Sequence, residues 1–482
     1  MNLKSLIIVL FFYLFTLSLN AQNKAFTTKL PIVYIDTHGK EIRDDPRIKA
    51  KLEIAWNHTG DENSTTDPRN HFNGDIKIEI RGSSSQMFPK KSYGFELKDE
   101  FDEDMDFPLL GMPEEEDWIL YAPYTDKTLI RNVLTLTLAE QISDVYAPRC
   151  RYVELFVNNE YNGVYVLMEQ IKRDSNRVDI AKLKENDLQG EELTGGYIIK
   201  VDKFTGSGGD GWNSKFSSDG SKTFYQYDYP KSSEIQSEQK QYIQNYMHNF
   251  ETAVYNNEHS EEIGYQNYMN SESFFDYIFM NELSRNVDGY RLSTYLYKDK
   301  NDKLNAGPLW DFNLSFGNAN YLNGWETFGL QVHEYLGNDN WKIPFWWKNL
   351  MGDAYFTNPM KCRWEFLREV ELSDERIFSV TDSLINHIEL AAVRNFERWP
   401  ILGEWIWPNY FVGDDYESEV SWMKNWMTER IRVLDYSLPG DCGADPGLPP
   451  IEFSASIYPN PFSANFSIEI ESDAYLAYNL KI

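Results

Sequence analysis

Two aspartates flank a short predicted hairpin and offer the clearest chemistry in this chain. The apolar segment ESFFDYIFMNEL predicts a helix that ends just before the loop holding Asp288. Alternating residues then predict a strand over 293–299, and after a polar turn a second strand, KLNAGPLWDF, leads to Asp311. Two carboxylates held in this way suit metal-assisted phosphoryl transfer, with one near an attacking hydroxyl and the other on a divalent cation. The alternative is that both are ordinary solvated turn residues.

A serine-rich bend supplies a second group of candidates. The segment RGSSSQMFPKKSYGFEL contains the hydroxyls of Ser83 and Ser84, followed by the adjacent Lys90 and Lys91. Hydroxyls, backbone N–H groups and a nearby ammonium are what a phosphate tail needs. Because strand residues alternate, only one lysine can point inward, and we expect it to be Lys91, which shares its face with the apolar residues of that strand. A flexible turn beside two solvent-facing lysines is the alternative.

Length and composition bound the class of protein. The chain has 482 residues and a formal net charge of -29, and 42% of its residues are hydrophobic. Such a chain can bury one large core or two. The negative charge argues against a sequence-independent nucleic-acid binder, which needs a basic face. The acidic runs at 98–107 and 113–117 are interpreted as solvated loops, because neither has the glycine-turned pattern of a calcium loop.

The N-terminus predicts export. Lys4 precedes an apolar run at 6–19, and the small residue Ala21 follows, so residues 1–21 are interpreted as a secretory signal peptide. A membrane anchor is the alternative, but the run is short for a span. No later segment of the sequence is apolar enough to cross a bilayer, which favours a secreted or cell-surface protein. Three cysteines allow at most one internal disulfide.

The order of predicted elements indicates an α+β protein. Strand-like patterns occupy 26–56, 76–98 and 195–203, and a hairpin with asparagine-rich turn residues covers 151–171. One helix is predicted from about residue 126 to 142, and long helical patterns dominate from residue 237 onward. A β-rich first part followed by a mainly helical part predicts two unequal lobes.

Several motifs follow one another along this layout. They are R-G-x-S-S…P-K-K-x-Y at 81–93, D-W-I-L-Y…D-K-T-x-x-R-N at 117–132, V-E-L-F-V-N-N-E-Y-N-G-V-Y-V-L-M-E-Q-I at 153–171, G-G-Y-I-I-K-V-D at 195–202, N-V-D-G-Y-R-L-S at 286–293 and G-P-L-W-D-F-N at 307–313. In that order they resemble the CotH (spore coat protein H) kinase family, over about residues 30–435. No single motif is specific, but the ordered set is.

The resemblance implies a two-lobed protein-kinase-like fold over 26–435, with an N-lobe at about 26–203 and a C-lobe at about 204–435. It implies an atypical secreted protein kinase that uses ATP and a divalent metal, Mg²⁺ or Mn²⁺. By this resemblance Asp288 is the catalytic aspartate and Asp311 the metal-binding aspartate. The implied nucleotide contacts are Lys91 or Lys90, Arg81, Ser83 and Ser84, with Glu169 near the hinge that meets adenine.

Two positions of the chain depart from the usual kinase pattern. Kinases often place Asn five residues after the catalytic aspartate as a second metal ligand, and this chain has Ser293 there. Where a second acid could follow the metal-binding aspartate, the chain has Asn313. A hydroxyl and a neutral amide bind hard cations less strongly than carboxylates do, so the resemblance predicts a metal site at Asp311, Ser293 and Asn313 of modest affinity.

The C-terminal end carries a separate pattern. Residues 436–450 form a Pro/Gly-rich linker, and Y-P-N-P-F at 458–462 begins a run of short alternating apolar residues. This end resembles the start of the C-terminal sorting domain of the type IX secretion system, a small β-sandwich of Bacteroidetes-type bacteria. Residues 451–482 are too few for a complete sandwich, so we expect a partial domain and a link to an outer-membrane secretion machinery.

The sequence therefore predicts a secreted kinase that phosphorylates Ser or Thr of exported or cell-surface proteins. The alternative is a catalytically weak kinase-fold surface module that binds protein or carbohydrate. Tryptophan-rich segments at 344–347 and 405–409 could stack on sugars or pack in the core, and the core is favoured for both. A glycoside hydrolase is a third reading, but no acid pair beyond Asp288 and Asp311 stands out.

Overall fold

The computed structural model describes residues 26–58, 62–203, 210–443, 453–458 and 467–472. The predicted signal peptide lies outside these residues. The chain divides into two compact units, of which unit 1 comprises 1–134, 148–171 and 380–421 and unit 2 comprises 135–147, 172–379 and 422–482. This division differs from the predicted lobe boundary near 203. Residues 172–203 lie with unit 2, and the segment 380–421 returns to unit 1 from far along the sequence.

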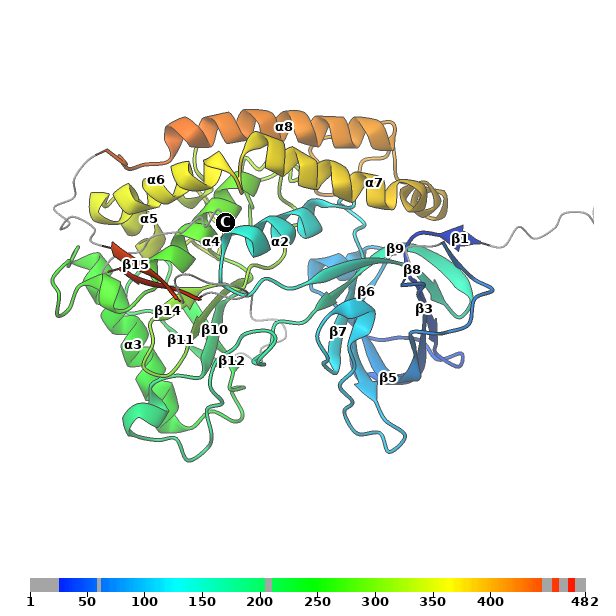
Figure 1. The fold of residues 1–482 in the computed structure, drawn as a ribbon, viewed down its shortest axis with the longest axis horizontal. Coiled ribbons are helices and arrows are strands. Elements are labelled where there is room, and N and C mark those ends of the chain that lie inside the picture. The colour runs from blue at the N-terminus through cyan, green and yellow to red at the C-terminus, as the bar shows by residue number, and fades with distance from the viewer. Residues whose placement is uncertain (1–25, 59–61, 204–209, 444–452, 459–466, 473–482) are drawn as a thin grey trace, which may run out of the picture. The chain divides into compact units, whose positions relative to one another are not determined.

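Unit 1 is built around a closed β-barrel with the strand order β2-β3-β5-β6-β7-β9-β8 (Figure 1). All neighbouring pairs are antiparallel except β2 and β8, which run parallel and close the barrel. Closure leaves no unpaired strand edge. The barrel strands are β2 (Ile32–Asp36), β3 (Ile48–Ala55), β5 (Phe72–Arg81), β6 (Ser92–Lys98), β7 (Asp117–Tyr121), β8 (Cys150–Val157) and β9 (Glu160–Glu169). Two further short strands pair with each other: β1 (Thr27–Thr28), which precedes β2 in the chain, and β4 (Asn63–Ser64), which follows β3.

Local sequence explains the predicted β8–β9 hairpin, which the structure confirms. Its two turn residues, Asn158 and Asn159, have φ angles of 50° and 66°. Two left-handed residues define a type I′ turn, and asparagine is among the few residues that adopt this conformation readily. Inward-facing apolar side chains of the barrel strands, such as Ile78, Phe95 and Trp118, form its core.

Unit 2 contains a five-stranded antiparallel sheet in the order β11-β12-β10-β13-β14. Its strands are β10 (Tyr197–Val201), β11 (Gly211–Asn213), β12 (Phe224–Tyr229), β13 (Thr294–Lys298) and β14 (Leu304–Ala306). Helix α4 (Ser271–Ser284) is buried on all sides and packs against β14 and α6. A helix that is apolar all round belongs in a core. The second part of the chain is thus helical as expected, but it also holds a sheet.

The described residues form seven α-helices in total. Besides α4, they are α2 (Arg131–Ile142), α3 (Ser237–Tyr255), α5 (Phe345–Met351), α6 (Ala354–Glu369), α7 (Asp374–Arg398) and α8 (Tyr416–Ser437). None of the helices formed by these residues is sufficiently long and apolar to span a bilayer. The α+β class is confirmed, with a barrel and helices in one chain.

Two predicted boundaries are wrong by a few residues. The helix expected from about residue 126 begins at Arg131 instead. The reason is local, because the Asp126 carboxylate accepts hydrogen bonds from the backbone N–H of Thr128 (3.1 Å) and of Arg131 (2.9 Å), which folds a turn ahead of the helix. The second hairpin strand ends at Ala306, so Asp311 lies on the loop that follows it.

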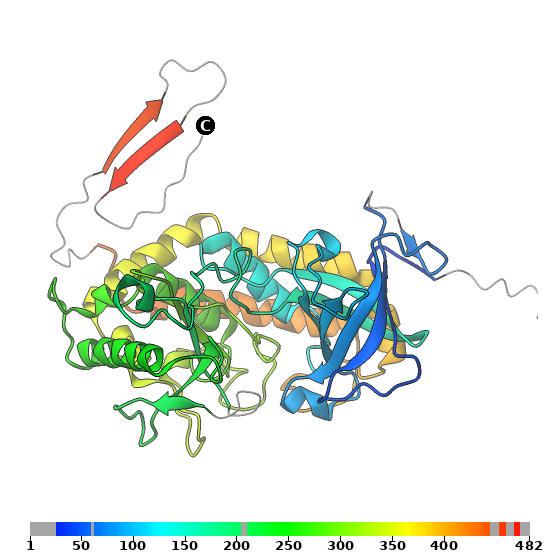
Figure 2. The same cartoon turned by 90° about the horizontal axis from the view of Figure 1, so that it is seen from below.

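The end of α8 is fastened to unit 2. A disulfide joins Cys362 on α6 to Cys442, which agrees with the predicted limit of one bridge. Leu438, just beyond α8, is buried. Residues up to Cys442 therefore belong to the folded unit, and the predicted start of the linker at residue 436 is wrong for residues 436–442. Beyond it, β15 (Phe453–Tyr458) and β16 (Ser467–Ser472) form an antiparallel hairpin, drawn as two adjacent arrows in Figure 2.

Candidate functional site

Helix α4 delivers the chain into the loop that carries Asp288. The helix ends at Arg285, whose left-handed backbone (φ 45°, ψ 55°) donates its N–H to the carbonyls of Asn281 and Glu282. This is the usual way in which a left-handed residue stops a helix. Gly289 follows Asp288 and lies so close to Asn281 that an added Cβ would be 2.3 Å from its Oδ1. Only glycine fits there, and the loop is thereby held tightly on the helix.

The side chain of Asn286 joins the two aspartate loops. Its Oδ1 accepts the backbone N–H of Asp288 at 3.2 Å, and its Nδ2 donates to the backbone carbonyl of Asp311 at 3.4 Å. Asn286 itself is only 2% exposed. The loops on either side of hairpin β13–β14 are therefore tied together, as the hairpin pattern predicted.

The two carboxylates differ in exposure but share a neighbour. The Asp288 side chain is 17% exposed, whereas Asp311 is exposed. Burial raises the pKa of Asp288 above its ordinary value. Burial also raises the pKa of the Tyr321 phenol, and the Asp288 and Asp311 carboxylates raise it further. Both acids thus lie within electrostatic reach of one buried phenol.

The oxygen atoms near Asp311 fit a hard cation. The Oδ1 atom of Asn313 is buried and has no hydrogen-bond partner among the described residues. A buried amide oxygen left unsatisfied is costly unless a ligand satisfies it. Together with the Asp311 carboxylate it gives the oxygen ligands that Mg²⁺ or Mn²⁺ prefers. Ser293 is half-buried, with a left-handed φ of 47° that turns the chain into β13.

Left-handed backbone is concentrated around these acids. Such conformations in non-glycine residues cost roughly 1–3 kcal/mol each and cluster at functional sites, where the surrounding structure enforces them. Between residues 285 and 323 they occur at Arg285, Tyr290, Ser293, Asn301, Asp311, Phe316, Leu322 and Asn323. Sequence reasoning had no signal for this concentration.

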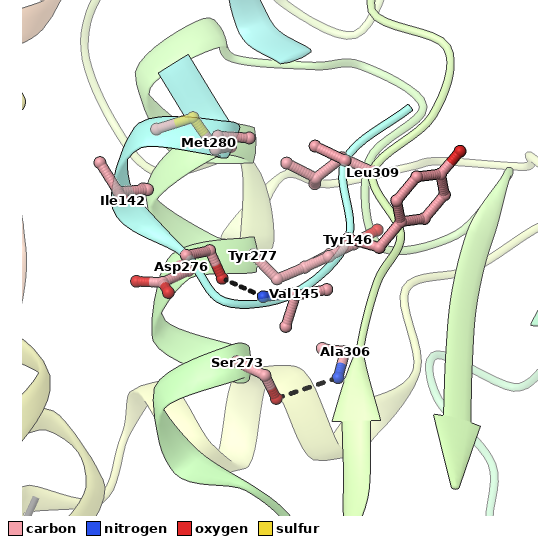
Figure 3. A pocket seen from close by; sticks show the side chains of 12 residues that line it. Ile142, Val145, Tyr146, Ser273, Asp276, Tyr277, Met280, Ala306 and Leu309 are labelled. Atoms are coloured by element: carbon pink, nitrogen blue, oxygen red, sulfur yellow. Dashed lines mark hydrogen bonds between the residues drawn. The ribbon is translucent and has the colours of Figure 1, made fainter. Parts of the chain in front are cut away.

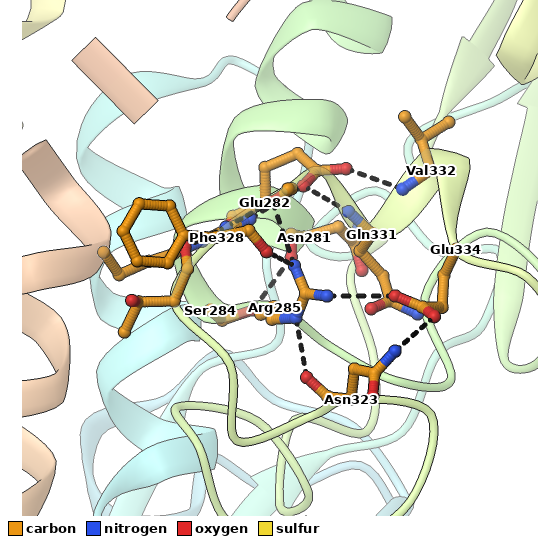
Figure 4. Close-up of polar contacts among 12 residues, drawn as sticks. Asn281, Glu282, Ser284, Arg285, Asn323, Phe328, Gln331, Val332 and Glu334 are labelled. Carbon is orange, nitrogen blue, oxygen red and sulfur yellow. Dashed lines mark hydrogen bonds and ion pairs between the residues drawn. The ribbon is translucent and has the colours of Figure 1, made fainter. Parts of the chain in front are cut away.

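A buried polar network joins the end of helix α4 to the segment 323–334 (Figure 4). Glu282 is fully buried, and its carboxylate accepts the backbone N–H of Gln331 (2.7 Å) and of Val332 (2.9 Å). It also forms a 2.9 Å ion pair with Arg430, which is equally buried. Burial lowers the pKa of Arg430 to about 10, and the Glu282 charge opposes that shift. Every carboxylate oxygen is satisfied, so the network can hold the loop rigidly.

Arg285 extends the network at the start of the loop. Its guanidinium donates to the carbonyls of Asn323 (2.9 Å), Phe328 (2.7 Å) and Gly329 (2.9 Å). It pairs with the Glu334 carboxylate at 3.0 Å, as Figure 4 shows. The segment 323–334 is thereby fixed against the end of α4.

The serine-rich bend in unit 1 is held mainly by backbone contacts. It contains the short 3-10 helix η1 (Ser84–Met87), and Ser83 and Ser84 are exposed. Gly82 has a φ of 109°, and a Cβ there would lie 2.1 Å from the Ser85 hydroxyl oxygen. The bend requires glycine at this position, and it presents the two predicted hydroxyls to solvent.

The two lysines face the opposite way from the prediction. Lys90 is 2% exposed, and its ammonium donates to the Val164 carbonyl (2.6 Å) and to Asn395 Oδ1 (2.8 Å). Burial lowers the pKa of Lys90 well below its ordinary value. Lys91 is half-buried and donates to the Gln86 carbonyl of the bend at 2.5 Å. The expectation that Lys91 points inward is wrong, because β6 begins at Ser92 and strand alternation does not extend back to the lysines.

The remaining predicted nucleotide contacts lie on barrel strands. Arg81 ends β5 and pairs in register with Ser92. Glu169 ends β9 just before the boundary between the units at 171, and it is fully buried. Its carboxylate accepts the backbone N–H of Arg149 and pairs with that guanidinium, each at 2.9 Å. The Glu169 carboxylate is therefore committed to Arg149.

One pocket lies within unit 2, beside α4 (Figure 3). Mostly apolar residues line it, including Ile142, Met280 and Leu309, and its volume is about 20 Å³. That volume suits a water molecule, whereas ligand pockets usually measure roughly 300–1,000 Å³. The one acid in its lining, Asp276, is paired with Arg363 at 2.7 Å. The pocket is not a nucleotide site.

The two acidic runs that the sequence treated as solvated loops meet in unit 1. The carboxylates of Asp106, Glu115 and Glu116 lie within 4.8 Å of one another, and Glu115 is buried. The strand-like pairing of Phe107 with Glu115 brings the runs together. The interpretation as separate solvated loops is wrong for Glu115, although an acidic cluster by itself does not define a cation site.

Comparison with known proteins gives the family. Residues 78–434 match the CotH kinase protein family, so the chain belongs to the CotH kinase family. The match contains every predicted site residue but begins later than the start near residue 30 that the motifs suggested. Membership suggests an atypical kinase, and kinases in general use ATP and a divalent metal. No curated protein matches the chain.

Proposed function

We propose that the protein is an exported atypical protein kinase that transfers the γ-phosphoryl group of ATP to serine or threonine hydroxyls of exported or cell-surface proteins. The observation that supports this best is the pairing of the Asp288 and Asp311 loops through Asn286. A carboxylate near an acceptor hydroxyl and a second carboxylate suited to a metal are the two acids that phosphoryl transfer requires.

In this proposal Asp288 is the general base. It accepts the proton of the acceptor hydroxyl as that oxygen bonds to the γ-phosphorus, while the bond from the phosphorus to the β–γ bridging oxygen breaks and ADP leaves. Asp311, Asn313 and Ser293 would hold Mg²⁺ or Mn²⁺, which when bound offsets charge on the phosphates. The partly buried position of Asp288 keeps the base away from bulk water.

The serine-rich bend contributes the phosphate contacts. Ser83 and Ser84 would donate hydroxyl hydrogen bonds to phosphate oxygens, and Lys91 and Arg81 would supply positive charge. Lys90 was a candidate for the same role, but its buried ammonium is bonded within unit 1, and we assign it to holding the barrel. Glu169 would sit near adenine through its backbone, since its carboxylate is bonded to Arg149.

Export is part of the same proposal. The signal-like segment at 1–21 and the sorting-domain-like segment at 451–482 support secretion through an outer-membrane machinery. Sequencing the N-terminus of protein recovered from the culture medium of the native host tests it. A mature chain that begins just after Ala21 is the expected result, and an intact Met1 would contradict it.

The direct test is transfer from labelled ATP. Purified protein is incubated with Mg²⁺ or Mn²⁺ and a generic Ser/Thr acceptor, beside the Asp288→Asn and Asp311→Ala variants. Labelling of the acceptor or of the protein itself, lost in both variants, is the expected result. A folded wild-type protein that transfers nothing with either metal would overturn the proposal.

One observation favours a second candidate function, a surface binding module. Trp346 and Trp347 are fully buried, as the sequence favoured, but Trp405 is 57% exposed, Trp407 40% and Tyr410 48%. The core interpretation is therefore wrong for segment 405–409. A backbone hydrogen bond from Gly403 to Gly413 (2.8 Å) closes the loop that carries these rings. Exposed aromatic side chains on a closed loop suit stacking on a ligand.

Tryptophan fluorescence tests this second function. Soluble glycans and candidate protein partners are titrated into the wild type and into Trp405→Ala and Trp407→Ala variants. Saturable quenching that is lost in both variants would support the binding module. If no titrant changes the fluorescence and phosphoryl transfer is observed, the binding-module function is excluded and only the kinase function remains.

A further inference from the structure

Arg291 lies between Asp288 and a third acid that the sequence did not single out. Its guanidinium is 2% exposed, and Nη2 contacts Asp288 Oδ1 at 3.0 Å. The other terminal nitrogen, Nη1, contacts Asp339 Oδ2 at 3.0 Å and the Trp341 carbonyl at 3.2 Å. Nε donates to the Val287 carbonyl at 3.0 Å. The guanidinium is therefore fixed from three sides.

Asp339 is itself held in place. Its second oxygen, Oδ1, accepts the backbone N–H of Trp341 at 2.9 Å, and its own N–H donates to the Leu336 carbonyl at 2.9 Å. The side chain is 28% exposed. Asp339 thus acts as a rigid anchor for Arg291, although it stands 48 residues farther along the chain.

We propose that Arg291 is a positioning residue for phosphoryl transfer, and that Asp339 anchors it. The inference rests on the proposed role of Asp288. Arg291 holds Asp288 by one oxygen only, and the other, Oδ2, makes no hydrogen bond to any described residue. A carboxylate fixed by one oxygen points the other in a set direction, which is what a general base requires.

Arg291 and Asp339 also affect the pKa of Asp288 through their charges. Burial raises the pKa of Asp288, and the positive charges of Arg291 and Lys203 oppose that rise. Asp202 and Asp339 add to the rise. Arg291 therefore favours the ionised form, which is the form that accepts a proton. Asp339 acts in the opposite direction and limits that influence.

These opposite signs allow a sharp test. Arg291→Met removes a charge that lowers the Asp288 pKa, so the acid limb of the kcat/KM profile should move to higher pH, with a loss of at least tenfold in kcat. Asp339→Asn removes a charge that raises it, so the limb should move to lower pH. Arg291→Lys keeps the charge but not the two-sided contact, so we expect kcat to fall while the limb stays near its wild-type position. KM for ATP should change little in all three.

Arg285→Lys is the matched control. Arg285 is also a buried arginine paired with a carboxylate of a later loop, Glu334 at 3.0 Å, but it does not contact Asp288. This variant should lose thermal stability without moving the acid limb. If Arg291→Met and Asp339→Asn move the limb in the same direction, or leave it where Arg285→Lys leaves it, Arg291 has only a structural role.

A second measurement keeps the inference separate from the kinase proposal. With ¹³C-labelled aspartate, the infrared difference between the wild type and Asp288→Asn reports the ionisation of Asp288 without any turnover. The same difference taken in the Arg291→Met background should titrate at higher pH, and in the Asp339→Asn background at lower pH. An unchanged titration would overturn the proposed role of Arg291 and Asp339 even if the enzyme is active. If the expected shifts occur without any phosphoryl transfer, the kinase proposal fails, and only the orientation of Asp288 by Arg291 and Asp339 stands.

Discussion

The two groups of candidate residues belong to different units and are held in different ways. The loops that carry Asp288 and Asp311 are joined to each other by the Asn286 side chain, and the buried Glu282–Arg430 pair holds the helix that precedes them. The serine-rich bend in unit 1 is exposed and is held by its own backbone and by Lys91. Burial and the fully hydrogen-bonded Glu282 carboxylate hold the end of α4 in place, whereas the serine-rich bend can adjust to a phosphate tail. A base held in a fixed position suits a reaction in which proton transfer needs accurate geometry.

Loss of either acid should produce the largest change. Asp288→Asn should lower transfer by about 10²–10⁴-fold, the usual contribution of a general base, while nucleotide binding survives. Asp311→Ala should abolish metal-dependent nucleotide binding with little loss of stability, because an exposed loop residue makes few packing contacts. Thermal-shift titration with ATP and metal beside transfer assays separates the two. Equal loss of binding and transfer in Asp288→Asn would mean that Asp288 is a structural or metal residue.

The buried polar network at the end of α4 should also contribute strongly to the stability of the protein. Arg430→Met leaves the Glu282 charge buried without its partner, and breaking such a pair costs about 3–5 kcal/mol. The control on the same helix is Arg432→Met, since Arg432 and Glu429 pair at 2.9 Å with side chains 66% and 58% exposed. Exposed pairs contribute about 0–1 kcal/mol. Urea unfolding of both variants measures the difference, and similar losses would contradict the rigid-scaffold description.

Substitution of the two adjacent lysines tests the role of the serine-rich bend. Lys91→Met should raise KM for ATP by about tenfold, equivalent to ~1.4 kcal/mol, and leave the melting temperature almost unchanged. Lys90→Met removes the ammonium that donates to the Val164 carbonyl and leaves Asn395 Oδ1 with only the Val164 N–H as donor. This loss should cost about 1–3 kcal/mol of stability and should spare KM. If KM for ATP rises in Lys90→Met and not in Lys91→Met, the buried Lys90 contacts the phosphates of ATP instead of Lys91.

Ser293→Asn should have the smallest effect. The left-handed φ of 47° at this position is one that asparagine accepts readily. The added amide oxygen should raise turnover a few-fold at low metal concentration, because it is a better ligand for a hard cation than a hydroxyl. Transfer is measured against metal concentration, with Ser293→Ala as the control. Unchanged metal dependence in a folded protein would exclude Ser293 from the metal site.

Local sequence patterns predicted the parts of this structure that depend on short-range geometry. The β8–β9 hairpin follows from Asn158 and Asn159, whose preference for left-handed backbone fixes the turn. The loops carrying Asp288 and Asp311 follow from an apolar helix and an alternating strand. The roles of the individual site residues remain predictions, since geometry alone does not test them.

Long-range contacts account for what the sequence could not predict. The buried Lys90 ammonium donates a hydrogen bond to Asn395 on helix α7, which is distant in the sequence, and no local pattern reports such a partner. Asp339 reaches Arg291 through tertiary folding, and only Arg291 itself lay in a recognised motif. The return of segment 380–421 to unit 1 is likewise a property of the whole fold.

The disulfide has a topological consequence. Cys362 and Cys442 both belong to unit 2, but the segment 380–421 that lies between them in the chain belongs to unit 1. The covalent ring they close therefore passes through both units. Ring closure lowers the conformational entropy of the unfolded chain. For a ring of this order of length, the fold is thereby stabilised by about 4–5 kcal/mol. Reduction of this bond would therefore also favour unfolding of the part of unit 1 that lies in the ring, although unit 1 contains neither cysteine of the bridge.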